Sequence, residues 1–250
     1  MAIFRALVFA AAISGLLAGL LLAVMQQTAT VPLILKAETY EEAAPPAVHD
    51  HASHDHAAQD HSDPGPAGAG QVAAGHDHAD EWTPAEGMER LLYTALANVV
   101  GAAGFALLLL AVSEAAGGLS GWRDGLAWGL AAFAAVALAP SISLPPELPA
   151  MPAADLLARQ AWWVGTVVAT GAGIALLVYG RSLPLAALAI GLIVLPHLVG
   201  APQPASHDSP VPHALAQSFA VTVVVTSFVF WAVLGALAGF LRQHFTRRVA

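Results

Sequence analysis

Histidine and aspartate alternate along one stretch of this sequence in a pattern that is typical of metal binding. Residues 43–80, here called the histidine-rich segment, hold seven of the eleven histidines: His49, His51, His54, His56, His61, His76 and His78. Neutral imidazole is the commonest protein ligand for first-row transition metals, and the interleaved carboxylates offset the charge of the ion. His-x-His spacing in a flexible chain lets two or three ligands wrap one ion. We therefore expect exchangeable binding of a divalent metal, with no permanent cofactor.

The identity of the metal is only partly restricted by the sequence. The chain has no cysteine and 4 methionines, which disfavours Cu(I). Cobalt, nickel, zinc and Cu(II) stay open, because imidazole affinity follows metal availability and the Irving–Williams trend. We expect metal retention to fall as the pH drops through about 6.5, where imidazole protonates. The alternative interpretation is a solvated linker that binds metals incidentally.

Further candidate side chains lie in the C-terminal part of the chain. Three more histidines and a carboxylate in a Pro-Pro-Glu turn could form a rim that receives the ion: His197, His207, His213 and Glu147. Glu147 is expected to pair with Arg159 or to meet the incoming cation. Asn98 is the clearest polar residue within an apolar segment, and it either bonds a neighbouring helix or contacts a passing ion.

The overall composition is that of an integral membrane protein. Of the 250 residues, 57% are apolar and only 10% are charged, whereas soluble domains are about 25% charged. This excludes an ordinary globular enzyme, a nucleic-acid-binding protein and a disordered chain. The phosphate-binding loop, the Gly-x-Ser-x-Gly turn and the His-Glu-x-x-His motif are all absent from the sequence. We predict no catalytic residues and no enzymatic activity.

Six apolar segments must position these candidates. Each is long enough, or nearly so, to cross about 30 Å of hydrocarbon as a helix: 3–25, 91–112, 125–139, 161–180, 183–199 and 214–241. Continuous apolar runs without two-residue alternation predict helices and exclude a barrel. The predicted fold is an all-α polytopic bundle of about six transmembrane helices. Its parts are a first helix (1–35), a flexible periplasmic loop (36–89) and a five-helix bundle (90–250) with a Pro-rich outer loop (140–160).

Small residues and basic residues add two expectations about this bundle. The pairs Gly101 with Gly104 and Gly171 with Gly173 are predicted to let helices approach closely. Basic residues favour cytoplasmic termini, because six would lie inside and three outside: Arg5, Arg123, Arg181, Arg242, Arg247 and Arg248 against Lys36, Arg90 and Arg159. Ten of the eleven histidines then lie on the outer face.

Four segments of the chain resemble a known family. They are VPLILKAETYE (31–41), APSISLPPELP (139–149), ARQAWW (158–163) and LPHLVGAP (195–202). In order and spacing they are similar to the CbtA family, predicted cobalt transporter subunits of bacterial inner membranes. The resemblance implies cobalt uptake for cobalamin synthesis and a small partner, CbtB, with one span and a histidine-rich tail. That family is often described with five spans, so the prediction of six spans differs from that description.

Taken together, these features predict a subunit of an inner-membrane uptake transporter for a divalent transition metal. Cobalt is the favoured substrate, with nickel and zinc as further candidates. The expected partners are the lipid bilayer, the metal ion and a CbtB-like subunit, and no nucleic acid. The alternative function is a membrane-anchored metal buffer or sensor that binds metal without transporting it.

Overall fold

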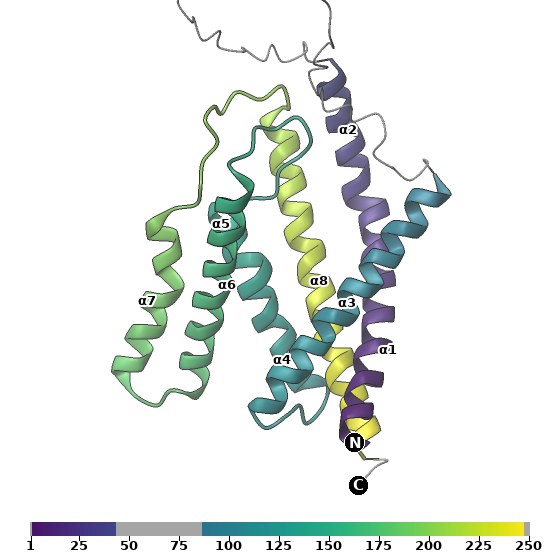
Figure 1. The fold of residues 1–250 in the computed structure, drawn as a ribbon, viewed down its shortest axis with the longest axis vertical. Helices are drawn as coiled ribbons and strands as arrows, with labels where there is room; N and C mark the ends of the chain where they lie inside the picture. The colour runs from purple at the N-terminus through teal and green to yellow at the C-terminus, as the bar shows by residue number, and fades with distance from the viewer. Residues whose placement is uncertain (1, 44–86, 248–250) are drawn as a thin grey trace, which may run out of the picture.

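The computed structural model describes residues 2–43 and 87–247, and within these ranges it is helical with no strand. The α-helices are α1 (Ala2–Met25), α2 (Val31–Glu42), α3 (Met88–Ala115), α4 (Trp122–Phe133), α5 (Ala139–Ser143), α6 (Leu156–Tyr179), α7 (Leu183–Val199) and α8 (His213–Thr246) (Figure 1). Two π-helical turns, η1 (Gln26–Thr30) and η3 (Ala134–Leu138), connect α1 to α2 and α4 to α5. The predicted all-α fold is confirmed.

The described helices include five that are long and apolar enough to cross a membrane. They are Ile3–Glu41, Met88–Ala115, Trp122–Ser143, Leu156–Tyr179 and His213–Thr246. The sixth apolar helix, α7, has 17 residues, which at a rise of 1.5 Å gives about 25 Å. That length is slightly short of the roughly 30 Å hydrocarbon core. All six predicted apolar segments are thus helical among the described residues, and five of them reach spanning length.

Each π-helical turn ends two residues before a proline that would otherwise interrupt the helix. Pro32 and Pro140 occupy the second positions of α2 and α5. Proline lacks an N–H group and clashes with the carbonyl one turn earlier. The wider π turn, in which the Val31 N–H group bonds the Gln26 carbonyl, relieves that clash. The first helix therefore continues through Glu42, beyond residue 35, where the sequence predicts its end.

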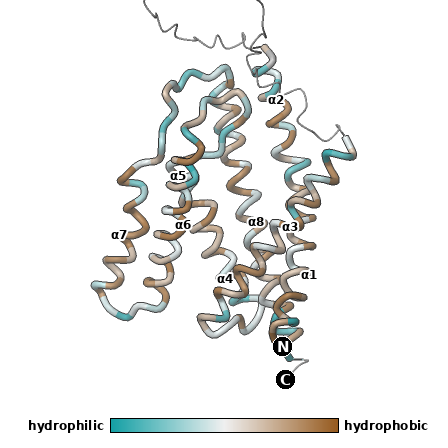
Figure 2. The backbone as a smooth tube through the Cα atoms, viewed as in Figure 1, coloured by the Kyte–Doolittle hydropathy of each residue, from teal (hydrophilic) through white to brown (hydrophobic). Residues whose placement is uncertain are grey.

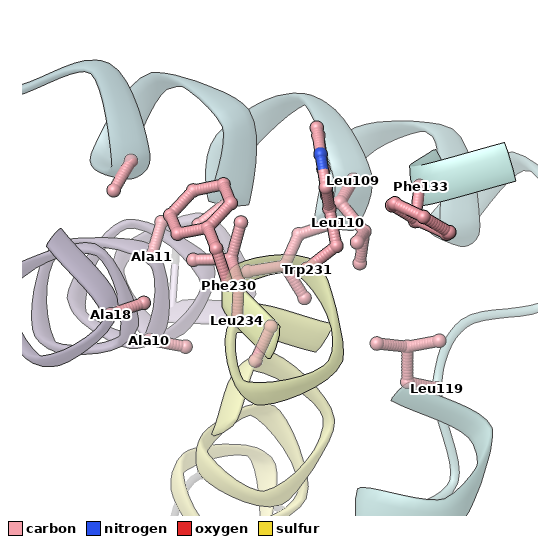
Figure 3. Close-up of a cluster of buried hydrophobic side chains, with 13 residues drawn as sticks. Ala10, Ala11, Ala18, Leu109, Leu110, Leu119, Phe133, Phe230, Trp231 and Leu234 are labelled. Carbon is pink, nitrogen blue, oxygen red and sulfur yellow. The ribbon is translucent and has the colours of Figure 1, made fainter. Parts of the chain in front are cut away.

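Helices α1, α3, α4 and α8 pack together as a unit that we call the body. We include in it η3, α5 and the loop through Leu148, which continue the chain from α4. Its core gathers alanines of α1 and α3 around larger side chains of α3, α4 and α8 (Figure 3). Trp231 of α8 lies at its centre, with ring centroids 5.1 Å from Phe105 and 5.5 Å from Phe230. Leu110 and Leu234 are almost completely buried. This packing holds α8 against α1, α3 and α4.

Glycines bring the backbones of the body into direct contact. A Cβ atom added to Gly125 of α4 would lie 2.1 Å from the Gly235 carbonyl oxygen of α8. One added to Gly129 would lie 2.3 Å from the Trp231 carbonyl oxygen. On the other side of α8, a Cβ on Gly15 of α1 would lie 2.4 Å from the Ala103 backbone of α3. No side chain fits at these crossings, which is the arrangement of small-xxx-small helix contacts.

The glycine pairs predicted from the sequence are mostly not at helix contacts. Gly101, Gly104 and Gly171 have no described atom within 4 Å of an added Cβ, so that prediction was wrong for them. The packed face of α3 instead carries Ala102 and Ala106, which are buried. Gly173 does lie at a contact, where an added Cβ would be 2.8 Å from the Ala189 carbonyl oxygen of α7.

Helices α6 and α7 form an antiparallel hairpin beside the body (Figure 1). The hairpin meets the body through α6, which contacts α4, η3 and α5, while α7 packs mainly on α6. Its outer surface is apolar and exposed, as expected for a lipid-facing element. Figure 2 shows this hydrophobic colouring along both helices. The hairpin is therefore attached to the rest of the molecule along a limited contact.

The molecule has two distinct ends. The start of α1, the end of α8, and the α3–α4 and α6–α7 loops lie together at what we call the termini end (Figure 1). The end of α2, the starts of α3 and α8, and the loops after α5 and α7 lie at the opposite end, called the rim end. A second apolar cluster at the rim end, of Ala37, Leu148, Val211, Leu215 and Phe219, fixes α2 against these loops.

Candidate functional site

The histidine-rich segment can be placed only through its neighbours. His49, His51, His54, His56, His61, His76 and His78 all lie outside the described residues. The described chain ends at Ala43 after α2 and resumes at Gly87 before α3, and both positions are at the rim end (Figure 1). The segment therefore leaves and re-enters the bundle at the end that carries His197, His207 and His213.

The four segments on which the family resemblance rests also meet at the rim end. Ala37, from the first segment, is buried with Leu148 of the Pro-rich segment. Trp162, from the third, donates its indole N–H to the Pro196 carbonyl of the fourth at 3.3 Å. The Pro-rich and third segments are joined by Glu147 and Arg159. Residues as far apart in sequence as Ala37 and Leu148 thus lie in one cluster here.

His197 is held by contacts from two other helices. It lies in the last turn of α7, and its Nδ1 atom is 2.8 Å from the Ser143 Oγ at the end of α5. The Trp162 ring of α6 meets the imidazole edge-on, with centroids 6.3 Å apart. The imidazole is half-buried. The sequence singles out His197 but not Ser143, because nothing in sequence spacing links positions on different helices.

Glu147 and Arg159 form an ion pair with 2.9 Å between Oε2 and Nη2. This is one of the two outcomes expected for Glu147, and that pairing is confirmed. The side chains are 20% and 27% exposed, respectively. The Arg159 Nε atom is buried and has no hydrogen-bond partner among the described residues. Arg159 lies in the first turn of α6, whose N-terminus is capped by the Asp155 carboxylate, 2.8 Å from the Ala158 nitrogen.

Asn98 takes part in a contact between helices. Its side-chain amide donates to the Gln26 Oε1 atom at 2.6 Å and so joins α3 to the η1 turn. This is the helix–helix hydrogen bond that was one of the two expectations for Asn98. Gln26 itself was missed, although a Gln-Gln pair directly after an apolar run is a recognisable signal in the sequence.

The remaining rim candidates stay apart. His207 lies in the loop after α7 and His213 begins α8, and both side chains are exposed. Over residues 2–43 and 87–247, no three His, Cys, Asp or Glu side chains are grouped closely enough to hold a metal ion. The described part of the rim thus offers single ligands and not a preassembled site. Such an arrangement suits transient contact with an ion better than permanent binding.

Between the hairpin and the body lies an apolar cavity of about 570 Å³. Its walls come from α3, α4, η3, α6 and α8 and include Trp128, Trp163 and Trp231, with no ionisable group other than the Tyr179 phenol. The buried hydroxyls of the spans lie elsewhere and mostly bond their own helix, as Thr166 does to the Trp162 carbonyl at 2.9 Å. Thr170 Oγ1 is buried without a partner among the described residues.

The termini end is held by a charged contact that the sequence did not predict. Arg242 of α8 bonds both carboxylate oxygens of Glu114 of α3 and donates to the Leu119 carbonyl at 2.6 Å. Gly118, at φ +78°, turns the connecting loop around the guanidinium group. The two partners are 128 residues apart, so the pair is visible only in the fold.

Comparison with known proteins gives one finding. The family described as "Probable cobalt transporter subunit (CbtA)" matches residues 4–243 of the sequence. No curated protein and no solved structure matches the chain. The family match covers nearly every helix of the bundle, including all four segments that meet at the rim end. This multi-pass membrane protein, helical throughout its described spans, therefore belongs to the CbtA family of probable cobalt transporter subunits.

Proposed function

We propose that this protein is the membrane-embedded subunit of an uptake transporter for a divalent transition metal, with Co²⁺ as its substrate. The observation that carries the proposal is that both described ends of the histidine-rich segment lie at the same end of the bundle as His197 and Glu147. Family membership supports cobalt as the substrate. Nickel and zinc are chemically compatible with the same ligands.

The rim end faces the periplasm and the termini end faces the cytoplasm of a bacterial inner membrane. The distribution of basic side chains supports this orientation, because five lie at the termini end: Arg5, Arg123, Arg181, Arg242 and Arg247. Lys36, Arg90 and Arg159 lie at the rim end. An excess of basic residues near span ends is typical of the cytoplasmic side.

Capture of the metal begins on the histidine-rich segment and continues at the rim. The ion passes from the imidazoles of that segment to His197, with His207 and His213 as further transient ligands. A dication that approaches Glu147 competes with Arg159 for the carboxylate, so this position can exchange one cation for another. Beyond the rim, Asn98, threonine hydroxyls and backbone carbonyls are the polar groups that can replace waters of the ion.

A partner subunit completes the transporter. The family description names a subunit, and the chain offers no nucleotide-binding motif that could supply energy. We propose a small CbtB-like protein, with one span and a histidine-rich tail, as that partner.

Uptake of radiolabelled cobalt by cells with and without the protein tests the proposal. Expression should raise uptake, and deletion of residues 49–78 should reduce it at low cobalt but leave it intact at high cobalt. A membrane-anchored buffer would instead lose all retention on that deletion. Equal uptake with and without the protein, tested with the partner subunit present, would contradict a role in transport.

A further inference from the structure

The ring of His197 presents only one nitrogen outwards. Its Nδ1 atom is occupied by the hydrogen bond with Ser143, at 2.8 Å. Its Nε2 atom makes no hydrogen bond with any described residue. Nor is Nε2 among the buried side-chain atoms that lack a partner. It follows that Nε2 is the nitrogen that an ion at the rim would meet.

Ser143 differs from its neighbour on the same helix. The Ser141 hydroxyl donates to the Leu138 carbonyl at 2.8 Å, which is the usual bond of a serine within a helix. The Ser143 hydroxyl bonds His197 instead. Ser143 is the last residue of α5, where the helix ends and the side chain is free to reach α7. The contact therefore depends on where α5 terminates.

The serine hydroxyl can hold the imidazole in both of its neutral forms. Without metal, the hydroxyl can donate to Nδ1 while Nε2 carries the proton. When a metal occupies Nε2, the ring proton must be on Nδ1, and the hydroxyl then accepts it in a hydrogen bond. The ring stays neutral in both forms, so the exchange moves one proton from Nε2 to Nδ1 and releases none. Histidine ligands of metals typically donate their other N–H in this way.

Two further contacts fix the plane of the ring. The Trp162 indole meets the imidazole edge-on, and the same indole N–H anchors the adjacent Pro196 carbonyl at 3.3 Å. Pro196 restricts the backbone before His197. With the backbone held by α6 and Nδ1 held by α5, few orientations remain for Nε2.

We propose that Ser143 is a positioning residue that presents the Nε2 atom of His197 to the incoming divalent metal. This inference rests on the proposed function, in which His197 receives the ion. Ser143 does not touch the metal. It acts through the ring that it orients, and outer partners of this kind typically change metal affinity or activity about 10- to 100-fold when removed.

Four variants of the full-length protein test the proposal through cobalt uptake normalised to protein in the membrane. Ser143→Ala should raise the cobalt concentration for half-maximal uptake about 10- to 100-fold. Ser143→Thr keeps the hydroxyl, so its cobalt concentration for half-maximal uptake should be close to that of the unaltered protein. Ser141→Ala is the matched control and should behave as the unaltered protein does. His197→Ala should lose uptake at low cobalt, whatever residue stands at 143.

A spectroscopic measurement separates positioning from a merely structural role. In purified full-length protein with ¹⁵N-labelled histidine, Zn²⁺ serves as a diamagnetic probe, and the His197 signals are those absent from His197→Ala. We expect Zn²⁺ on Nε2 with the proton on Nδ1. In Ser143→Ala, Zn²⁺ should bind Nδ1 as well as Nε2, so the ¹⁵N signals should show a mixture of the two arrangements. Zn²⁺ bound through Nδ1 in the unaltered protein would overturn the inference, even if Ser143→Ala fails to fold.

The outcomes also separate this inference from the proposed function. Uptake unchanged in His197→Ala would remove His197 from the metal path and the role of Ser143 with it. Loss of uptake in His197→Ala, with a normal half-saturation value in Ser143→Ala, would overturn the positioning role alone.

Discussion

The body and the α6–α7 hairpin are joined by different kinds of contact. In the body, α4 and α8 touch backbone to backbone at Gly125 and Gly235, with no room for a side chain. The polar attachments of the hairpin to the body are instead made by side chains at the rim end, between Arg159 and Glu147 and between His197 and Ser143. Two of those four side chains are candidate metal ligands. The difference indicates that the body provides a fixed frame, whereas the hairpin is attached where the proposed metal ligands lie.

The two kinds of contact differ in how much they should stabilise the fold. A side chain added where two helix backbones touch cannot move aside, so the helices themselves must separate. Side-chain hydrogen bonds contribute about 0.5–1.5 kcal/mol each, and partly exposed ion pairs about 0–1 kcal/mol. Substitutions in the body should therefore destabilise the protein more than those at the rim.

The largest effect is expected for Gly235→Leu. A Cβ at this position would lie 2.3 Å from the Gly125 carbonyl oxygen, so α4 and α8 must separate. We expect a loss on the order of 3 kcal/mol in the free energy of unfolding, measured as a lower midpoint of thermal unfolding in detergent. Gly104→Leu is the matched control, since no described atom lies within 4 Å of its added Cβ. Equal effects of both substitutions would contradict the described packing of the body.

The next effect is expected at the termini end, for Arg242→Met. The substitution removes the bonds from the guanidinium to Glu114 and to the Leu119 carbonyl. The Arg242 side chain is only 16% exposed, so solvent screens these bonds weakly. We expect a loss of about 2 kcal/mol, in the range of hydrogen bonds to charged groups, measured in the same unfolding assay. Arg247→Met serves as the control, because Arg247 is exposed. A normal midpoint for Arg242→Met would show that this contact does not hold α3 to α8.

A smaller effect is expected at the rim end for Arg159→Gln. The substitution removes the ion pair with Glu147, and we expect a loss of about 1 kcal/mol because both side chains are partly screened by solvent. Arg90→Gln is the control, since its pair with Glu38 is longer, at 3.6 Å, and more exposed. A loss as large as that of Gly235→Leu would mean that the hairpin is part of the fixed frame.

The smallest effect is expected for Asp155→Ala. The carboxylate accepts a hydrogen bond from the Ala158 nitrogen and caps α6. Loss of such a cap should cost roughly 0.5 kcal/mol at this exposed position. Asp155→Asn keeps an acceptor and should show almost no change in the unfolding midpoint. If Asp155→Asn destabilises the protein as much as Asp155→Ala does, the charge of Asp155 matters and the cap does not.

Much of the fold could be predicted from the sequence, because the apolar runs are long and the charges between them are few. The continuation of α1 into α2 could not be predicted, because a proline such as Pro32 usually ends a helix. Here the preceding turn widens to a π turn and the helix continues. Of the four glycines predicted at helix contacts, only Gly173 lies at one. The spacing of Gly125 and Gly129, and of Gly235 and Gly239, is the small-xxx-small signal that identifies the correct ones.

The candidate site was predicted less completely. His197, Glu147 and Arg159 are identifiable as polar residues at the ends of apolar segments, and the pairing of Glu147 with Arg159 is confirmed. Ser143 is not identifiable, because its role depends on the place where α5 ends next to α7. The metal-binding roles of the rim and of the histidine-rich segment stay predictions.

The most direct test of the account is the side of the membrane on which the rim end lies. The sequence has no cysteine, so single cysteines can be placed at will in exposed positions at the two ends: Asp208→Cys at the rim end and Arg247→Cys at the termini end. We predict that a membrane-impermeant maleimide labels Asp208→Cys in spheroplasts, and labels Arg247→Cys only after permeabilisation. Labelling of Arg247→Cys in intact spheroplasts, with Asp208→Cys protected, would contradict import from the rim end.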